Sequence, residues 1–236
     1  MFTKPQIIEG ILYCKSTMKY EDKLKGRYGE ALTIIDPLIK SKGDACYIIN
    51  EGERVVLIFP GSNDVIDWIL NFYKYDKPVD GIHPGIKLGI ELLAEKIIAK
   101  LLELKPNTLC IYGFSRGAAL ADAYLELYGD AIPCEIDCIT YAQPKLFTQA
   151  FYDKIPSMKD RSNVYFLRVE MANDVVTKIP FKKYGYRFKG NYLTLGKKIP
   201  WYKQLRMFWL RLKNNKEFFL AGISEHDLDV YLDEMK

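Results

Sequence analysis

Residues 108–128 constrain the fold of this chain more than any other stretch. An apolar run of strand-forming residues passes into a run of good helix formers, and between them stands Gly113-Phe114-Ser115-Arg116-Gly117. A strand that joins a helix with almost no loop must turn sharply, and the two glycines remove the Cβ atoms that would collide there. The serine is then strained, with its hydroxyl above the sheet edge and beside a helix N-terminus that stabilises negative charge. This pattern is typical of the nucleophile elbow of serine hydrolases.

The apolar patterning of the rest of the chain predicts one α/β domain over residues 1–236. Strands separated by helices indicate a mainly parallel central sheet with helices on both faces. The expected strands are 46–49, 55–59, 109–112, 135–141 and 164–169, and the expected helices are 3–20, 65–71, 86–104, 118–127 and 145–152. The charged, glycine-containing segment 21–44 is expected to be irregular with one short helix. No linker or shift in composition marks a second domain.

Composition predicts a soluble protein inside a cell. The chain is 49% hydrophobic and 27% charged, which is ordinary for a globular domain, and no apolar run approaches the ~20 residues of a membrane span. Glu9 interrupts the N-terminal apolar run, and no signal-peptide cleavage site follows. Five cysteines without a Cys-x-x-Cys pair indicate buried free thiols in a reducing compartment. We therefore expect a cytoplasmic location. A zinc site is not expected, because neither of the two histidines is near a cysteine.

A serine nucleophile at neutral pH needs a base within hydrogen-bond reach and a group that orients that base. His83 and His226 are the only histidines. In α/β-hydrolase sites the chain order is serine, acid, histidine, and only His226 satisfies it. We therefore assign His226 as the base and expect His83 to be structural, with a hydrogen bond to backbone near the site.

The acid should follow a strand between residues 115 and 226. Asp174 comes a few residues after the strand predicted at 164–169, in a turn-prone Asn-Asp pair. Glu170 lies closer to the end of that strand, and Asp137 lies within another strand, early in the chain. We favour Asp174, and Glu170 and Asp137 remain the alternatives.

An oxyanion hole requires two donors aimed at the developing charge. The backbone N–H of Arg116, immediately after the nucleophile, is expected to be one of them. The other is expected from the loop after the strand at 55–59, where Gly61 permits close approach and Ser62 offers its N–H or hydroxyl.

With these residues in place, the chain resembles the class 3 lipases, the fungal-lipase-like family of α/β hydrolases, from about residue 46 to residue 231. The matching segments occur in family order: Phe-Pro-Gly-Ser at 59–62, Asp-Trp-Ile-Leu-Asn at 67–71, His-Pro-Gly-Ile at 83–86, the elbow at 113–117, Tyr-Ala-Gln-Pro at 141–144 and Asn-Asp-Val-Val-Thr-Lys-Ile-Pro at 173–180.

The resemblance implies an α/β-hydrolase fold and hydrolysis of a carboxylic ester of a lipid. It implies an acyl-enzyme formed on Ser115, with His226 as base and Asp174 as its partner, and no metal or redox cofactor. Residues 65–72 would form a mobile lid, with Trp68 and Ile69 over the site.

Three positions depart from the family pattern. Pro60 stands where the family usually has arginine, Phe114 where it commonly has histidine, and Arg116 where it commonly has leucine. These departures leave the substrate class open. Pro60 and Arg116 also support an alternative function, a lipid- or membrane-binding protein that has kept the fold and lost activity. Labelling of Ser115 by a fluorophosphonate probe would separate the two.

Residues 181–216 carry eleven Lys or Arg residues and no Asp or Glu. Within them, apolar residues at 201, 205, 208, 209 and 212 follow helical spacing. Such a helix can dock on the core, or lie against an anionic membrane with its basic side chains on the headgroups. Nucleic-acid binding is not favoured, because it would leave the predicted triad unexplained.

Overall fold

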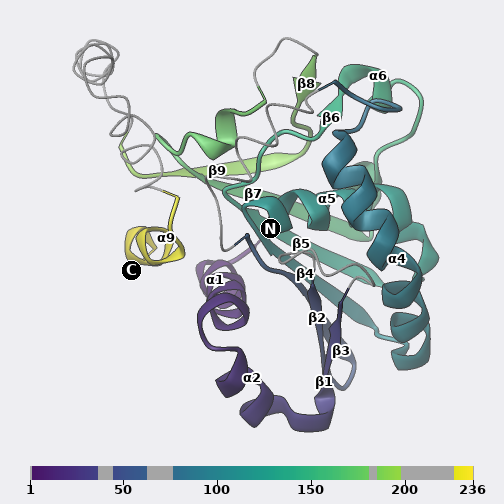
Figure 1. The fold of residues 1–236 in the computed structure, drawn as a ribbon, viewed down its shortest axis with the longest axis vertical. Coiled ribbons are helices and arrows are strands. Elements are labelled where there is room, and N and C mark those ends of the chain that lie inside the picture. Colours follow the sequence, from purple (N-terminus) through teal and green to yellow (C-terminus); the bar gives the residue numbers. More distant parts are fainter. Residues whose placement is uncertain (1, 37–44, 63–76, 181–184, 198–225, 236) are drawn as a thin grey trace.

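The computed structural model describes residues 2–36, 45–62, 77–180, 185–197 and 226–235. Its main feature is a seven-stranded sheet in the order β1-β2-β3-β4-β5-β7-β9 (Figure 1). The strands are β1 (Leu32–Ile35), β2 (Cys46–Glu51), β3 (Arg54–Phe59), β4 (Thr108–Phe114), β5 (Glu135–Tyr141), β7 (Val164–Met171) and β9 (Asn191–Leu195). Within this sheet β3, β4, β5, β7 and β9 are parallel, and β1 and β2 form an antiparallel edge. The expected mainly parallel α/β sheet is thus confirmed.

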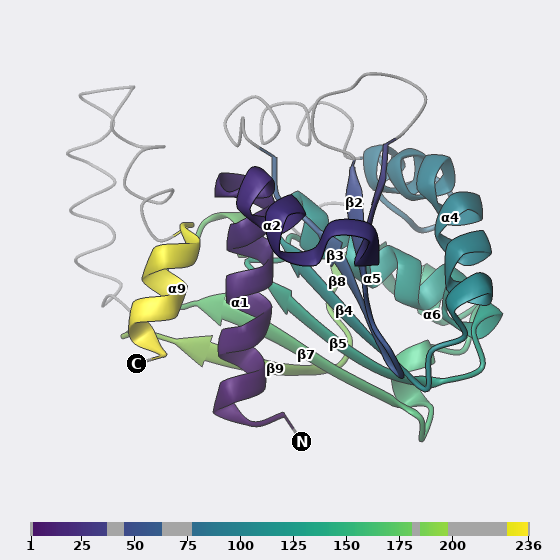
Figure 2. The same cartoon turned by 90° about the horizontal axis from the view of Figure 1, so that it is seen from below.

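Helices cover both faces of this sheet. The longer ones are α1 (Lys4–Lys19), α4 (Pro84–Leu104) and α5 (Arg116–Tyr128), and the shorter ones are α2 (Glu21–Tyr28), α6 (Gln149–Tyr152) and α9 (Leu228–Glu234). Helices α4 and α5 pack on one face, and α1 and α9 pack on the other (Figure 1). Helix α9 lies beside α1, although nearly the whole chain separates them in sequence (Figure 2).

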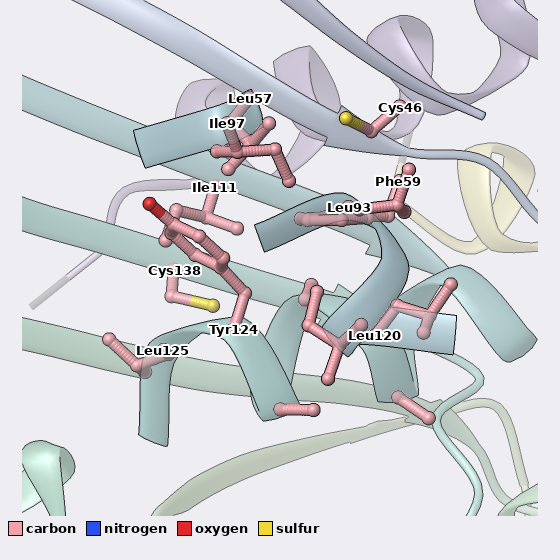
Figure 3. Packing of buried hydrophobic residues seen from close by; sticks show 14 of the residues in the cluster. Cys46, Leu57, Phe59, Leu93, Ile97, Ile111, Leu120, Tyr124, Leu125 and Cys138 are labelled. Carbon is pink, nitrogen blue, oxygen red and sulfur yellow. The ribbon is translucent and has the colours of Figure 1, made fainter. Parts of the chain in front are cut away.

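The apolar runs 55–59 in β3 and 109–114 in β4 are unbroken because each of these strands lies between two layers of helix. Along β3, Leu57 and Phe59 face α4 and α5, while Val56 and Ile58 face α1, and all four are fully buried. Figure 3 shows the first of these cores, where residues of β2, β3, β4 and β5 meet those of α4 and α5. The rigid sheet that results holds the carboxyl ends of β3, β4 and β7 close together.

Two strands of the sheet were not predicted from sequence. Strand β1 falls in the segment 21–44 that was expected to be irregular, and β9 falls in the basic stretch. Both are edge strands with little buried apolar surface: β9 is exposed or partly exposed throughout. Both strands form through backbone pairing, β1 with β2 and β9 with β7. The sequence contains no apolar pattern that would predict either strand.

The helix predicted at 145–152 is largely wrong. Residues 147–148 form β6 (Phe147–Thr148), which pairs with β8 (Tyr186–Arg187), and only α6 is helical. The lid predicted at 65–72, with Trp68 and Ile69, lies outside the described residues. So does the amphipathic run at 201–212.

All five cysteines are free thiols: Cys134 is partly exposed and the other four are buried. Burial raises the pKa of the Cys134 thiol to about 11. Among the described helices, none combines the length and the apolar character that a membrane crossing requires.

A buried ion cluster anchors α5, the helix that follows the elbow. The Lys159 ammonium lies 2.6 Å from Asp122 and 3.2 Å from Glu126, two residues of α5, and all three side chains are at most 3% exposed. The second Asp122 oxygen accepts a hydrogen bond from Gln143 Nε2 at 2.6 Å. Because every member is desolvated, each charge depends on its partners.

We expect Lys159→Met to lower the free energy of unfolding by about 3–5 kcal/mol, because it leaves two carboxylates buried without a cation. Burial lowers the pKa of Lys159, but Asp122 and Glu126 outweigh burial, so the pKa is raised. A raised lysine pKa contributes stability that is present below the unfolded pKa and lost as the pH rises through the folded one. Urea unfolding of the wild type should therefore show a loss of stability above about pH 10.

The matched control is Lys189→Met. Lys189 pairs with Asp160 at the surface, and an exposed pair of this kind contributes about 1 kcal/mol or less. Equal urea midpoints for the Lys159 variant and the wild type would show that the cluster does not stabilise the fold.

Candidate active site

Ser115 stands at the junction of β4 and α5 in a strained conformation, with φ 57° and ψ −122°. Its backbone N–H donates to the carbonyl of Tyr141 on the neighbouring strand at 2.9 Å. A Cβ on Gly113 would lie 2.6 Å from the Gly117 carbonyl oxygen, and one on Gly117 would lie 2.1 Å from that of Phe59. Only glycine fits at either position, so the turn has the sharpness expected from the sequence.

His226 reaches this turn from the far end of the chain. Its Nε2 lies 2.7 Å from Ser115 Oγ, and its Nδ1 lies 2.8 Å from Asp174 Oδ2. Because the carboxylate can only accept, Nδ1 carries the proton and Nε2 is left to accept from the serine hydroxyl. The structure therefore brings the three residues into one hydrogen-bonded chain.

Asp174 follows β7 in a short turn and is fully buried. Its Oδ1 accepts the N–H of Val176 at 2.8 Å, and its Oδ2 accepts the Tyr231 hydroxyl at 3.0 Å as well as the His226 N–H. A carboxylate without access to water needs such donors. Three of them surround Asp174.

The position of His226 depends on α9 and α1. His226 precedes Asp227, the residue that caps α9 by accepting the N–H of Asp229 at 2.9 Å. Lys19, in the last turn of α1, lies 3.6 Å from Asp227 and 3.0 Å from Asp229. These contacts join the C-terminal segment to the first helix and hold it over the end of β4.

The rejected candidates, His83, Glu170 and Asp137, have other surroundings. His83 precedes α4, and its backbone N–H donates to Leu146 at 2.9 Å. Glu170 lies 3.3 Å from Arg168. Asp137 is half-buried in β5, and burial raises its pKa. None of the described hydrogen bonds joins these residues to Ser115 or His226.

The loop after β3 packs directly against the elbow. A Cβ on Gly61 would lie 2.8 Å from Phe114 Cδ1 and 3.3 Å from Ser115 Cβ, and Ser62 is 8% exposed. Arg116 is the first residue of α5, and the first N–H groups of a helix have no acceptor within that helix. Burial lowers the pKa of the Arg116 guanidinium to about 10, so this side chain keeps its charge at neutral pH.

Sequence reasoning missed two aromatic residues at this site. Phe114 lies with its ring against the imidazole of His226, and Tyr231 contacts Asp174. In the sequence, Phe114 stands out only as a departure from the family pattern. Tyr231 follows His226 by five residues, a spacing that carries no signal by itself.

Comparisons with known proteins identify the family and the fold of this chain. The family model for lipase (class 3) matches residues 56–184. A structural match to Rhizomucor miehei triacylglyceride lipase has a TM-score of 0.62 at 17% identity and covers 83% of this chain and 82% of that one. For lipase II from Rhizopus niveus the TM-score is 0.60 and the identity 19%, with 82% of each chain covered.

A third match is to a triacylglycerol lipase whose catalytic centre is formed by a serine protease triad. It has a TM-score of 0.58 at 17% identity and covers 81% of this chain and 77% of that one. No curated protein sequence matches the chain. At these identities the structural matches establish the α/β-hydrolase fold. Since the family model covers more than half of the 236 residues and the motifs occur in order along it, the chain belongs to the class 3 lipase family.

Proposed function

We propose that this protein hydrolyses carboxylic esters of lipids with a catalytic triad of Ser115, His226 and Asp174. The observation that carries the proposal is the buried chain of hydrogen bonds, 2.7 Å from serine to imidazole and 2.8 Å from imidazole to carboxylate. Membership of the lipase family supports ester hydrolysis as the reaction type. The triad described for a triacylglycerol lipase of the same fold supports the roles of the three residues.

In the first half of the proposed reaction, Ser115 Oγ attacks the ester carbonyl while its proton passes to His226 Nε2. The backbone N–H of Arg116 and the N–H or hydroxyl of Ser62 donate to the resulting oxyanion. As the intermediate collapses, His226 returns the proton to the leaving oxygen. The alcohol departs, and the acyl group remains on Ser115.

In the second half, water loses a proton to His226 and attacks the acyl-enzyme. Collapse of the second intermediate releases the carboxylic acid and restores the Ser115 hydroxyl. Asp174 orients the imidazole throughout and stabilises it when it carries two protons. None of these steps requires a metal or a redox group.

The test of the proposal is labelling by a fluorophosphonate probe, combined with hydrolysis of short esters, triacylglycerols and phospholipids. Mass spectrometry should place the label on Ser115. Ser157 is an internal control, because it is buried and hydrogen-bonded to Glu126 at 2.7 Å, and it should remain unlabelled. An unlabelled protein that hydrolyses no ester but binds lipid vesicles would favour the alternative, a lipid-binding protein that has lost activity.

The substrate panel also bears on the departures at Pro60 and Arg116. A charged residue beside the nucleophile can change the pocket that receives the acyl group, so the preferred ester need not be a triacylglycerol. Peripheral contact of the basic stretch with anionic membranes remains a proposal from sequence. Residues 201–212, the part of that stretch whose sequence has helical spacing, lie outside the described residues.

A further inference from the structure

The ring of Phe114 forms a wall against the imidazole of His226. The two ring centroids are 4.9 Å apart and the planes make an angle of 27°, a stacked arrangement. Phe114 is 3% exposed and is the last residue of β4. The absence of a side chain at Gly61 leaves room for this ring. The imidazole therefore rests on a flat apolar surface that belongs to the central sheet.

Tyr231 contacts Asp174, at the other end of the hydrogen-bonded chain of Ser115, His226 and Asp174. Its hydroxyl donates to Asp174 Oδ2 at 3.0 Å and accepts the backbone N–H of Met171 at 2.9 Å. The side chain is fully buried. Because Met171 belongs to β7 and Tyr231 to α9, this hydroxyl connects the acid to both the sheet and the helix that follows His226.

The two aromatic rings also contact each other. The edge of one meets the face of the other, with centroids 6.4 Å apart and planes at 83°, a favourable geometry for an aromatic pair. Phe114, Tyr231, Asp174 and His226 thus form a closed ring of contacts drawn from β4, α9, the turn after β7 and the segment before α9.

We propose that Phe114 and Tyr231 act together as positioning residues for the base and the acid, an inference that rests on the proposed function. The Tyr231 hydroxyl keeps Asp174 Oδ2 aimed at Nδ1. The Phe114 ring keeps the imidazole in the plane that joins Asp174 to Ser115, and its face attracts the imidazolium formed when Ser115 is deprotonated. Both side chains are buried, so we expect them to act through His226 and Asp174 and not by contact with the ester.

The test compares Tyr231→Phe, Phe114→Leu and the double variant. Each single change should lower kcat about tenfold. Tyr231→Phe removes a hydrogen bond to the charged Asp174, and Phe114→Leu removes the ring that orients His226, so that the base is less often in the reactive position. KM should stay within about twofold, since the substrate contacts are untouched. A role confined to folding would lower stability and leave kcat per labelled active site unchanged.

Because the residues are in contact, their effects should not multiply. The double variant is expected to lose about twentyfold in kcat, well short of the hundredfold product of two independent effects. Phe114→His, which restores a flat ring and is the residue that the family commonly carries there, should recover most of the loss seen with leucine. A full hundredfold loss in the double variant would contradict joint action.

Two matched controls remove the same atoms elsewhere. Tyr124→Phe removes a fully buried hydroxyl on α5. Phe166→Leu replaces a buried ring on the face of the sheet opposite to Phe114. Both should retain wild-type kcat per active site titrated with the fluorophosphonate probe. If the wild type itself neither takes the label nor cuts an ester, the proposed function fails. If the wild type is active and Tyr231→Phe and Phe114→Leu match it in kcat, the positioning role alone fails.

Discussion

Replacing Ser115 with alanine is expected to lower kcat for ester hydrolysis by about 10³-fold or more. The reason is chemical: no acyl-enzyme can form without the hydroxyl, and only the oxyanion donors remain to accelerate direct attack by water. The fold should survive, because alanine fills the space of the serine Cβ and removes a single oxygen from a position that is 1% exposed.

The measurement is steady-state hydrolysis of the best ester of the panel, with circular dichroism and urea unfolding to verify folding. Ser157→Ala is the control. It removes a buried serine hydroxyl that is bonded to Glu126, and it should cost stability without lowering kcat. A folded Ser115→Ala protein with wild-type activity would falsify the mechanism.

His226→Ala is expected to reduce kcat about as far as Ser115→Ala, by about 10³-fold or more, because the serine hydroxyl then has no acceptor for its proton. The double variant Ser115→Ala with His226→Ala should be little worse than either single one. Residues that act as a unit lose their function together, so the second substitution removes nothing that is still in use.

The acid and the competing assignments are tested by the same assay. Asp174→Asn should be severe, because the neutral amide can donate its N–H to Nδ1 and so favour the wrong tautomer of His226, and because it does not stabilise the imidazolium as a carboxylate does; more activity can remain than in His226→Ala. His83→Ala and Glu170→Gln should leave kcat near that of the wild type. Loss of activity in His83→Ala with activity retained in His226→Ala would reverse the assignment of the base.

Local chemistry in the sequence determined the part of the site that depends on neighbouring residues. The elbow is one of these features, since its strand, glycines and helix lie within 21 consecutive residues and sterics leave few conformations open to them. The central strands β3 and β4 could equally be predicted, because burial on both faces favours an unbroken apolar run. With two histidines and a chain order, the choice of base followed by elimination.

Only the tertiary structure decided how distant segments meet. Residues 115, 174 and 226 become neighbours because β4 and β7 end at the same edge of the sheet and α9 packs on α1, and no local pattern encodes those distances. The edge strands β1 and β9 could not be predicted from sequence, because each is stabilised by pairing with a neighbouring strand and not by an apolar pattern of its own. The roles of Phe114 and Tyr231 could not be predicted either. The sequence does not distinguish an aromatic residue that fills the core from one that supports His226 and Asp174, and only the contacts in the folded structure do so.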